Sequence, residues 1–434
     1  MATVLPREIN YQTPASLPEG TQSSSIVSSP INGQTFGASS IIQFDLVQRG
    51  FLVPESMYIR YKNTYVGSAL AGANHVRGTP AYTFISRLET IVGSQVVESI
   101  SGYNVISNML VNSKMNYAQK LGISNAFGYS SAVQALSLFD ISTILPNGQS
   151  LTTTVAAGSS FFYAAPLGCL LSNCDRLVPL KYMPSCRIQL TTETLANAIQ
   201  SVANPILSYT MSNVELCYDV IEFSPMVDQA ISSRGGGMLT IKSQSYLSSG
   251  VTLPAASSGT LEFLFNQRLA SIKSLFCHLS GTVATVSLNT LFDSVDCTSG
   301  NGDYQFFIAG SPFPPRPLST VQNKAGISME LGSAFGPAHD LLTSNFSITP
   351  TEFNLSNTGV TTQNLMGKFY IGVNCEKLST NDALLTGVSS QGSPISFRVS
   401  IGTATTNAQV IQLICLYDAL MNIDMNTKTL VVMQ

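Results

Sequence analysis

The chain has 434 residues, of which 44% are hydrophobic and only 10% are charged, with a formal net charge of −3 and a mean hydropathy of +0.22. This composition excludes intrinsic disorder, which requires low hydrophobicity and high net charge. Ordinary soluble domains carry about 25% charged residues, and that charge keeps monomers apart. We therefore expect this folded chain to cover much of its surface with further copies of itself or with partners.

Residues 1–40 are rich in Ser, Pro, Gln and Gly and show little periodicity, which predicts an extended N-terminal arm that becomes ordered on a partner. Arg7 is the one basic residue of this arm, and the whole chain has 21 basic against 24 acidic residues. Because phosphate binding requires clustered Lys and Arg, we expect no direct nucleic-acid binding. The alternative for the arm is a tail without any partner. Its candidate contact residues are Val4, Leu5, Ile9, Tyr11, Leu17, Ile26 and Val27.

Residues 41–224 predict a first domain of β-strands with one helical excursion. Two β-rich runs, 88–92 and 95–100, flank a Gly93-Ser94 turn, which is typical of a tight hairpin. Between residues 103 and 121 the apolar spacing changes to that of one amphipathic helix. Further β-rich runs predict strands at 41–47, 57–61, 160–163, 187–191 and 209–223.

A boundary follows at residues 225–237. A short helix at 225–231 precedes the run Arg234, Gly235, Gly236 and Gly237, which we interpret as a flexible linker between two domains. The glycines are not followed by Lys-Ser or Lys-Thr, so the run does not read as a phosphate-binding loop.

Residues 238–434 predict a second domain and a C-terminal tail, again with strands before and after a helical segment. The helical segment, 326–342, is interrupted near Gly336-Pro337. The closing strands of the two halves share a Cys and a Tyr-Asp pair, Tyr218-Asp219 and Tyr417-Asp418, which is a weak internal repeat. Strands are predicted at 238–241, 261–265, 270–276, 304–308, 368–373, 395–401 and 410–420.

No arrangement of residues predicts a catalytic, cofactor or metal site. His75, His278 and His339 form no H-x-x-x-H pair, and the chain has no G-x-S-x-G or P-loop motif. Cys169 and Cys174 lack the second pair that a zinc site needs. Three acidic residues near Asn301 lack the spacing of a calcium loop: Asp293, Asp296 and Asp303.

The eight cysteines include no C-x-x-C, and the N-terminus lacks the basic head and apolar core of a signal peptide. We expect free thiols in a protein that folds in a reducing cytoplasm. A secreted, disulfide-linked protein is the alternative.

The order of these features resembles the double jelly-roll major capsid proteins of tailless icosahedral viruses, which include adenovirus and membrane-containing bacteriophages. Four features carry the resemblance: the hairpin at 88–100, the apolar turn and strand at 179–190, the proline-rich turn at 312–318, and the two Tyr-Asp strands. The resemblance spans about residues 40–425, and no single motif is diagnostic.

This resemblance implies an all-β chain of two consecutive eight-stranded antiparallel jelly-roll barrels, 41–224 and 238–434. It implies pseudo-hexagonal homotrimers that tile a virion shell and contact neighbouring trimers and penton or minor capsid proteins. The short chain and small loops point to membrane-containing bacteriophages, and hence to an internal lipid membrane beneath the arm. A viral spike or lectin-like receptor-binding double β-sandwich is the alternative. An enzyme on a β-barrel scaffold is a further one, for which no acid–base or metal constellation assembles.

Overall fold

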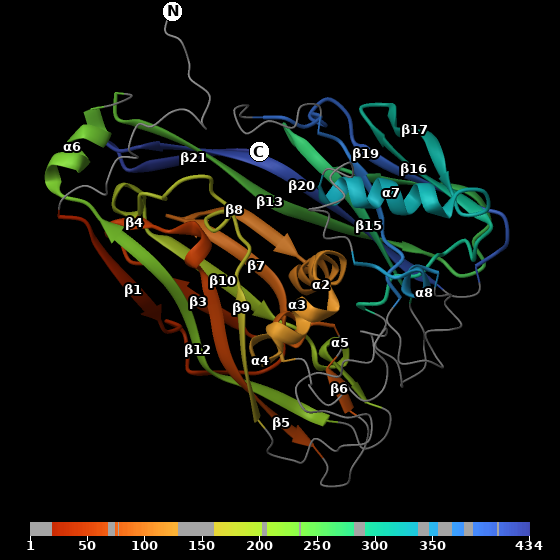
Figure 1. Ribbon diagram of the computed structural model, residues 1–434, viewed down its shortest axis with the longest axis horizontal. Helices are drawn as coiled ribbons and strands as arrows, with labels where there is room; N and C mark the ends of the chain where they lie inside the picture. The colour runs from red at the N-terminus through yellow and green to blue at the C-terminus, as the bar shows by residue number, and fades with distance from the viewer. Residues whose placement is uncertain are drawn as a thin grey trace, which may run out of the picture.

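The computed structural model describes residues 20–67, 74–76, 78–128, 160–201, 206–233, 236–281, 291–336, 347–354, 367–376, 385–405 and 408–434 (Figure 1). Among these residues the named strands pair antiparallel, and no sheet contains strands from both sides of residues 225–237. The chain is thus all-β, as predicted, with one set of sheets before this segment and one after it.

The first set forms a barrel of two main sheets. One sheet has the spatial order β1 (Gln22–Ser28), β12 (Ile206–Glu222), β5 (Tyr58–Gly67) and β9 (Ser160–Pro166), and β2 (Thr35–Phe36) and β4 (Phe51–Leu52) also pair with β12. The other has the order β3 (Ile41–Asp45), β10 (Cys186–Thr192), β7 (Ile85–Val92) and β8 (Gln95–Ser101). A small sheet joins β6 (Asn74–Val76) to β11 (Ile199–Ser201).

The second set forms a barrel in the same way. One sheet has the order β13 (Met238–Leu253), β20 (Gln409–Asp424), β15 (Ile272–Gly281) and β18 (Ile371–Asn374), with β21 (Thr429–Met433) paired to β20. The other has the order β14 (Gly259–Phe265), β19 (Ile395–Ile401), β16 (Gly302–Ile308) and β17 (Ser311–Ser319).

The two barrels share one strand order. If the eight principal strands that the described residues give to each barrel are numbered along the chain, both barrels have one sheet in the order 1-8-3-6 and one in the order 2-7-4-5. This is the jelly-roll topology, in which two four-stranded sheets enclose a common core. The predicted pair of jelly-roll barrels is therefore confirmed. The repeated Tyr-Asp strands prove to be equivalent elements, because β12 and β20 are both strand 8.

Alternation of apolar and polar residues explains why these segments fold as barrel walls. In β10, Ile188 and Leu190 are buried, whereas Arg187 and Gln189, which alternate with them, are partly exposed. Successive side chains of a strand point to opposite faces of the sheet, so one face of β10 enters the core and the other meets solvent. β12 alternates in a similar way, whereas β20 is buried on both faces over most of residues 413–421. Apolar residues from both barrels form the core.

Helices occupy corresponding places in the two barrels. Between strands 5 and 6 of the first barrel lie α2 (Tyr103–Lys114), α3 (Tyr117–Gly122) and α4 (Ser124–Phe127), and between those of the second lie α7 (Lys324–Phe335) and α8 (Pro350–Phe353). Figure 1 shows α6 (Pro225–Ser233) at the end of the molecule where the chain passes from one barrel to the other. The remaining short helices are η2 (Pro54–Ser56), α1 (Pro80–Thr83), η5 (Leu180–Tyr182) and α5 (Leu195–Ala198).

The predicted single helix at 103–121 is two helices. A break at Met115 and Asn116 separates α2 from α3. The Asn116 side chain accepts a hydrogen bond from the Gln119 backbone N–H at 2.9 Å, and the Gln119 side chain accepts one from the Asn116 N–H at 2.8 Å. Such a reciprocal pair satisfies the free N–H groups of a new helix start.

The proline-rich segment is not a turn but a strand, β17, and this corrects the prediction. Four prolines, at 312, 314, 315 and 317, suggested a turn because proline cannot donate to a β-ladder. In the structure β17 hydrogen-bonds to β16 on one side and forms the edge of its sheet. An edge strand tolerates prolines because its outer side has no ladder to supply.

The N-terminal segment 22–28 also differs from the predicted arm. It forms β1, which pairs with β12 over its whole length, from Gln22 opposite Glu222 to Ser28 opposite Leu216. The many serines hid this strand, since they weaken the apolar alternation that identifies a strand in the sequence. Any arm is therefore confined to residues before β1.

Candidate functional site

Within the described parts of the chain, no group of three or more His, Cys, Asp and Glu residues could hold a metal ion. All eight cysteines are free thiols, and all but Cys174 are buried. Burial raises the pKa of the Cys169 thiol to about 12, and that of Cys186 likewise. Because the thiolate is the reactive form, burial disfavours reaction at Cys169 and Cys186.

In the acidic loop around Asn301, the Asp296 carboxylate is hydrogen-bonded by groups of the loop itself and of β16. The Asp296 carboxylate accepts the backbone N–H groups of Thr298 at 2.9 Å and Gly300 at 2.8 Å. It also accepts the Tyr304 hydroxyl at 2.8 Å. Asp296 therefore shapes the turn before β16.

Among the described residues, no helix is long and apolar enough to cross a membrane.

A buried polar cluster lies where the two barrels meet. Glu98 of β8 is only 3% exposed. Its carboxylate accepts the Leu170 backbone N–H at 2.9 Å, the Thr90 hydroxyl at 2.6 Å, and the hydroxyl of Ser245 in β13. Burial raises the pKa of Glu98, and the three hydrogen bonds oppose that rise. A carboxylate of the first barrel is thus bound by a strand of the second.

Further hydrogen bonds extend this junction along β13. The Ser243 hydroxyl donates to the Leu170 carbonyl oxygen at 2.5 Å. The Asp175 N–H donates to the Lys242 carbonyl at 2.9 Å, and the Lys242 N–H returns a bond to the Asp175 carboxylate at 3.1 Å. Figure 1 shows β13, β20 and β21 running along the first barrel. Small side chains at Ser243 and Ser245 allow this close approach, and the two barrels are joined by a buried, hydrogen-bonded seam.

The C-terminus closes the same seam. The Gln434 side-chain amide donates to the Val97 carbonyl oxygen of β8 at 2.5 Å. The strand before it, β21, was not predicted from the sequence, because its five residues follow β20 after a short turn.

The described part of the predicted linker contacts both barrels. Asp228 of α6 forms an ion pair with Lys181, whose ammonium lies 5.0 Å from the centre of the Phe51 ring. Gly236 and Gly237 have positive φ values of 65° and 87°, which glycine adopts without strain. The Gly237 carbonyl accepts the Met425 N–H at 2.9 Å, so the glycines form a fixed turn into β13. Arg234 and Gly235 lie outside the described residues.

Two of the predicted arm residues fall in the sheet. Ile26 lies opposite Tyr218 and contacts the core, whereas Val27 lies opposite Cys217 and is 52% exposed. Outside the described residues lie Val4, Leu5, Ile9, Tyr11 and Leu17.

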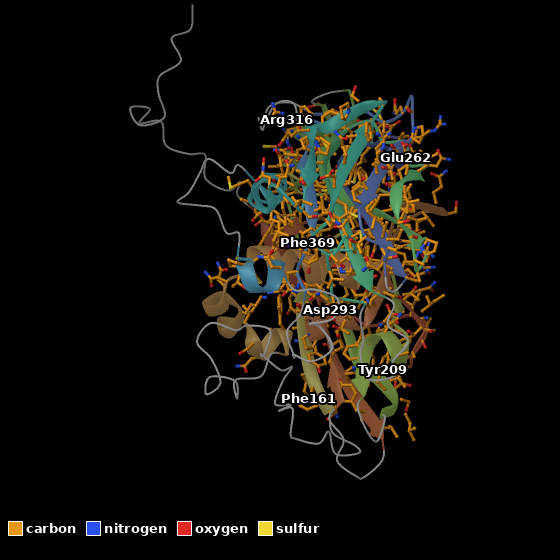
Figure 2. All side chains as sticks on the ribbon, turned by 90° about the vertical axis from the view of Figure 1, so that its right-hand side faces the viewer. Phe161, Tyr209, Glu262, Asp293, Arg316 and Phe369 are labelled. Carbon is orange, nitrogen blue, oxygen red and sulfur yellow. The ribbon has the colours of Figure 1, made fainter. Side chains whose placement is uncertain are left out.

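Large apolar side chains are exposed on both barrels. Phe162 of β9 is 63% exposed and Leu264 of β14 is 69% exposed, and Val431 of β21 is exposed as well. Figure 2 places Phe161 of the first barrel and Glu262 of the second toward opposite ends of the molecule. Each barrel therefore exposes large apolar side chains to solvent. Surfaces of this kind are typical of proteins that associate.

No protein-family model matches the chain, and no curated protein matches it by sequence. Solved structures do match. The Faustovirus major capsid protein aligns with a TM-score of 0.65 and 11% identity over 97% of this chain and 93% of its own. A PBCV-1 virus capsid structure aligns with a TM-score of 0.61 and 10% identity over 97% of this chain and 98% of its own. The mavirus major capsid protein aligns with a TM-score of 0.54 and 11% identity over 100% of this chain and 95% of its own. This chain thus has the double jelly-roll fold of these viral major capsid proteins.

Proposed function

We propose that this chain is a major capsid protein whose homotrimers tile an icosahedral virion shell. One observation carries the proposal: two barrels of identical strand order are joined by a buried seam in one chain. Three such chains around a three-fold axis present six similar barrels, which gives a pseudo-hexagonal block. Blocks of that outline pack edge to edge on a flat facet. The fold likeness to solved capsid proteins supports the same assignment.

The surface chemistry suits permanent contacts. Charged residues make up 10% of the chain, and apolar side chains such as Phe162 and Leu264 are exposed. Permanent interfaces bury about 2,000 Å² or more and are depleted of charge at their centres. Desolvating unpaired charges would weaken such interfaces, so a chain with few charges forms them at low cost.

The proposed role is structural and involves no enzymatic step. Partners in the shell are neighbouring trimers and penton or minor capsid proteins. Residues before β1, which include Val4, Leu5 and Ile9, contact a neighbouring trimer or an internal membrane. With 21 basic and 24 acidic residues, the chain leaves the genome to other components. The protein assembles in the host cytoplasm and resides in the virion.

The test is the state of the purified chain in solution. Light scattering should give a mass of about 139 kDa, three times the chain mass of 46.3 kDa. Negative-stain electron microscopy of the same sample should show particles of hexagonal outline. A stable monomer at micromolar concentration in physiological buffer would reject the proposal.

A further inference from the structure

A pocket of about 180 Å³ lies at the junction of the two barrels and is partly open to solvent. The helix α2 provides one wall, with Ile106, Leu110 and Val111. Ile100 of β8 adds to the first barrel's side, and Tyr246 of β13 provides the second barrel's side. Figure 1 shows α2 in the angle between the first barrel and the strands of the second. A ligand in this pocket would contact both barrels at once.

The polar side chains of the wall are already engaged within the protein. The Tyr82 hydroxyl donates to the Pro166 carbonyl oxygen at 2.9 Å. The Tyr103 hydroxyl accepts the Gly168 N–H at 2.9 Å and is hydrogen-bonded to Ser107. Among the wall residues, all of which lie in described parts of the chain, only Tyr246 has a hydroxyl that forms no hydrogen bond within the protein.

These contacts make the pocket a poor site for water. An ordered buried water forms two to four hydrogen bonds, and the wall side chains offer it one free hydroxyl. An enclosed apolar cavity of about 150 Å³ binds benzene, so a pocket of this size and lining has room for one aromatic ring. Such a ring displaces loosely held water, which gains affinity. The Tyr82 and Tyr103 rings meet edge to face, with centroids 6.2 Å apart, and present ring surface to such a ligand.

We propose that this pocket binds a small hydrocarbon, either one aromatic ring or the end of an alkyl chain, and that the bound ligand holds the two barrels together. The ligand fills apolar space between α2 and β13 that the protein leaves empty. A ligand that binds the joined barrels and not the unfolded chain raises the unfolding temperature, and the effect saturates as the site fills.

The experiment measures thermal unfolding of the full-length chain with increasing benzene, and separately with cyclohexane and hexane. Benzene should raise the unfolding temperature by at least about 2 °C in a saturable way, and pyridine, a polar ring of the same size, should not. The titration with hexane distinguishes an alkyl ligand from a ring. The chemical shift of dissolved ¹²⁹Xe provides an independent readout, since xenon enters dry apolar cavities.

Two pocket-filling variants test whether the ligand binds in this pocket. Ser107→Leu fills it with a larger side chain, and Leu110→Phe is the second filling variant if Ser107→Leu folds poorly. Ser328→Leu makes the same change on α7, outside the pocket. The benzene shift should vanish in a filling variant and persist in Ser328→Leu. An unsaturable shift, an equal shift in a folded filling variant, or a shift seen only after the oligomer dissociates would overturn the proposal. The last outcome would assign the pocket to a neighbouring copy of the chain.

Discussion

The carboxylate of Glu98 in the first barrel accepts a hydrogen bond from the hydroxyl of Ser245 in the second barrel. Both residues are buried, and they lie 147 positions apart in the chain. The two barrels are therefore not independent domains joined only by a linker. They share a polar seam whose strength depends on the state of one carboxylate and on the small size of one side chain.

The first prediction concerns the pH dependence of stability. Burial raises the folded-state pKa of Glu98 above the ordinary value of 4.5. The folded chain then binds more protons than the unfolded chain between these two pKa values, so stability falls as pH rises through that interval. Glu98→Gln keeps the shape and removes the ionisation. Relative to the wild type, the variant should gain stability as pH rises through the interval between the unfolded and folded pKa values of Glu98.

Urea unfolding at a series of pH values measures this difference. Glu262→Gln is the matched control, because its hydrogen bonds with Ser396 and Arg398 lower the pKa of Glu262. Its effect should be small, since Glu262 is exposed, and of opposite sign. Parallel pH profiles for the wild type and Glu98→Gln would contradict the role given to Glu98.

The second prediction concerns the size of Ser245. Leucine at this buried position cannot fit between the barrels without moving β13 away from β8, and overpacking of this kind costs about 1–3 kcal/mol. Calorimetry of Ser245→Leu should show a lower unfolding temperature, and proteolysis near residues 225–237 should become faster. Thr240→Leu, on an exposed position of the same strand, is the control and should change neither. Equal behaviour of the two variants would show that the seam does not hold the barrels.

The third prediction separates two neighbouring glycines. Both Gly236 and Gly237 have positive φ, so alanine at either position should cost about 1–2 kcal/mol in backbone strain. A Cβ at Gly237 would lie 2.5 Å from the Asn426 side-chain nitrogen, whereas a Cβ at Gly236 meets open space. Gly237→Ala should therefore lower the free energy of unfolding more than Gly236→Ala does. Chemical denaturation of the two variants measures the difference, and equal losses would mean that Asn426 moves aside freely.

Some elements of the fold could be predicted from the sequence alone. The strand predicted at 395–401 is β19, Ile395–Ile401, and the hairpin predicted at 88–100 is β7 and β8, with Gly93 at a φ of 62° in its turn. Local patterns specify such elements because alternation and turn chemistry act within a few residues. The edge strand β17 was hidden because prolines are tolerated only at an edge, and no local pattern reports a strand's place in its sheet.

The seam between the two barrels could not be predicted from the sequence, for a different reason. Its partners, Glu98 and Ser245, are joined by tertiary contacts alone, and a single sequence contains no signal of such a pairing. One local hint existed. Glu98 shares a strand face with Ile100, which is buried, so its carboxylate points into the protein rather than into solvent. A charged residue at an inward position of a strand predicts a specific partner, although it does not identify that partner.

The fourth prediction concerns salt. If the homotrimer depends on apolar and hydrogen-bonded contacts, screening of charges should not dissociate it, because salt weakens mainly exposed ionic interactions. The mass measured by light scattering should be the same in dilute buffer and in 0.5 M NaCl, a salt concentration at which the Debye length is only about 4–5 Å. A trimer that dissociates with rising salt would show that the few charged residues carry the interface.

The last prediction concerns the N-terminus, and the position of β1 sharpens it into a comparison of two deletions. Removal of residues 1–19 leaves every pair between β1 and β12 intact, so both barrels should fold and the trimer should form. Removal of residues 1–30 also takes away β1 and leaves one edge of β12 without its partner. That variant should unfold at lower temperature and aggregate, because an uncovered strand edge pairs with other chains.

The two deletions therefore separate folding from assembly. In the proposed role, the shorter deletion should form trimers that fail to close into shells or to attach to a membrane, since the apolar residues before β1 supply those contacts. Electron microscopy of the assembly products and flotation with lipid vesicles measure the two outcomes. Normal shells from the chain lacking residues 1–19 would refute a role for this segment. Tight, salt-sensitive DNA binding by the intact trimer would refute a shell that leaves the genome to other components, because 21 basic residues against 24 acidic ones do not predict it.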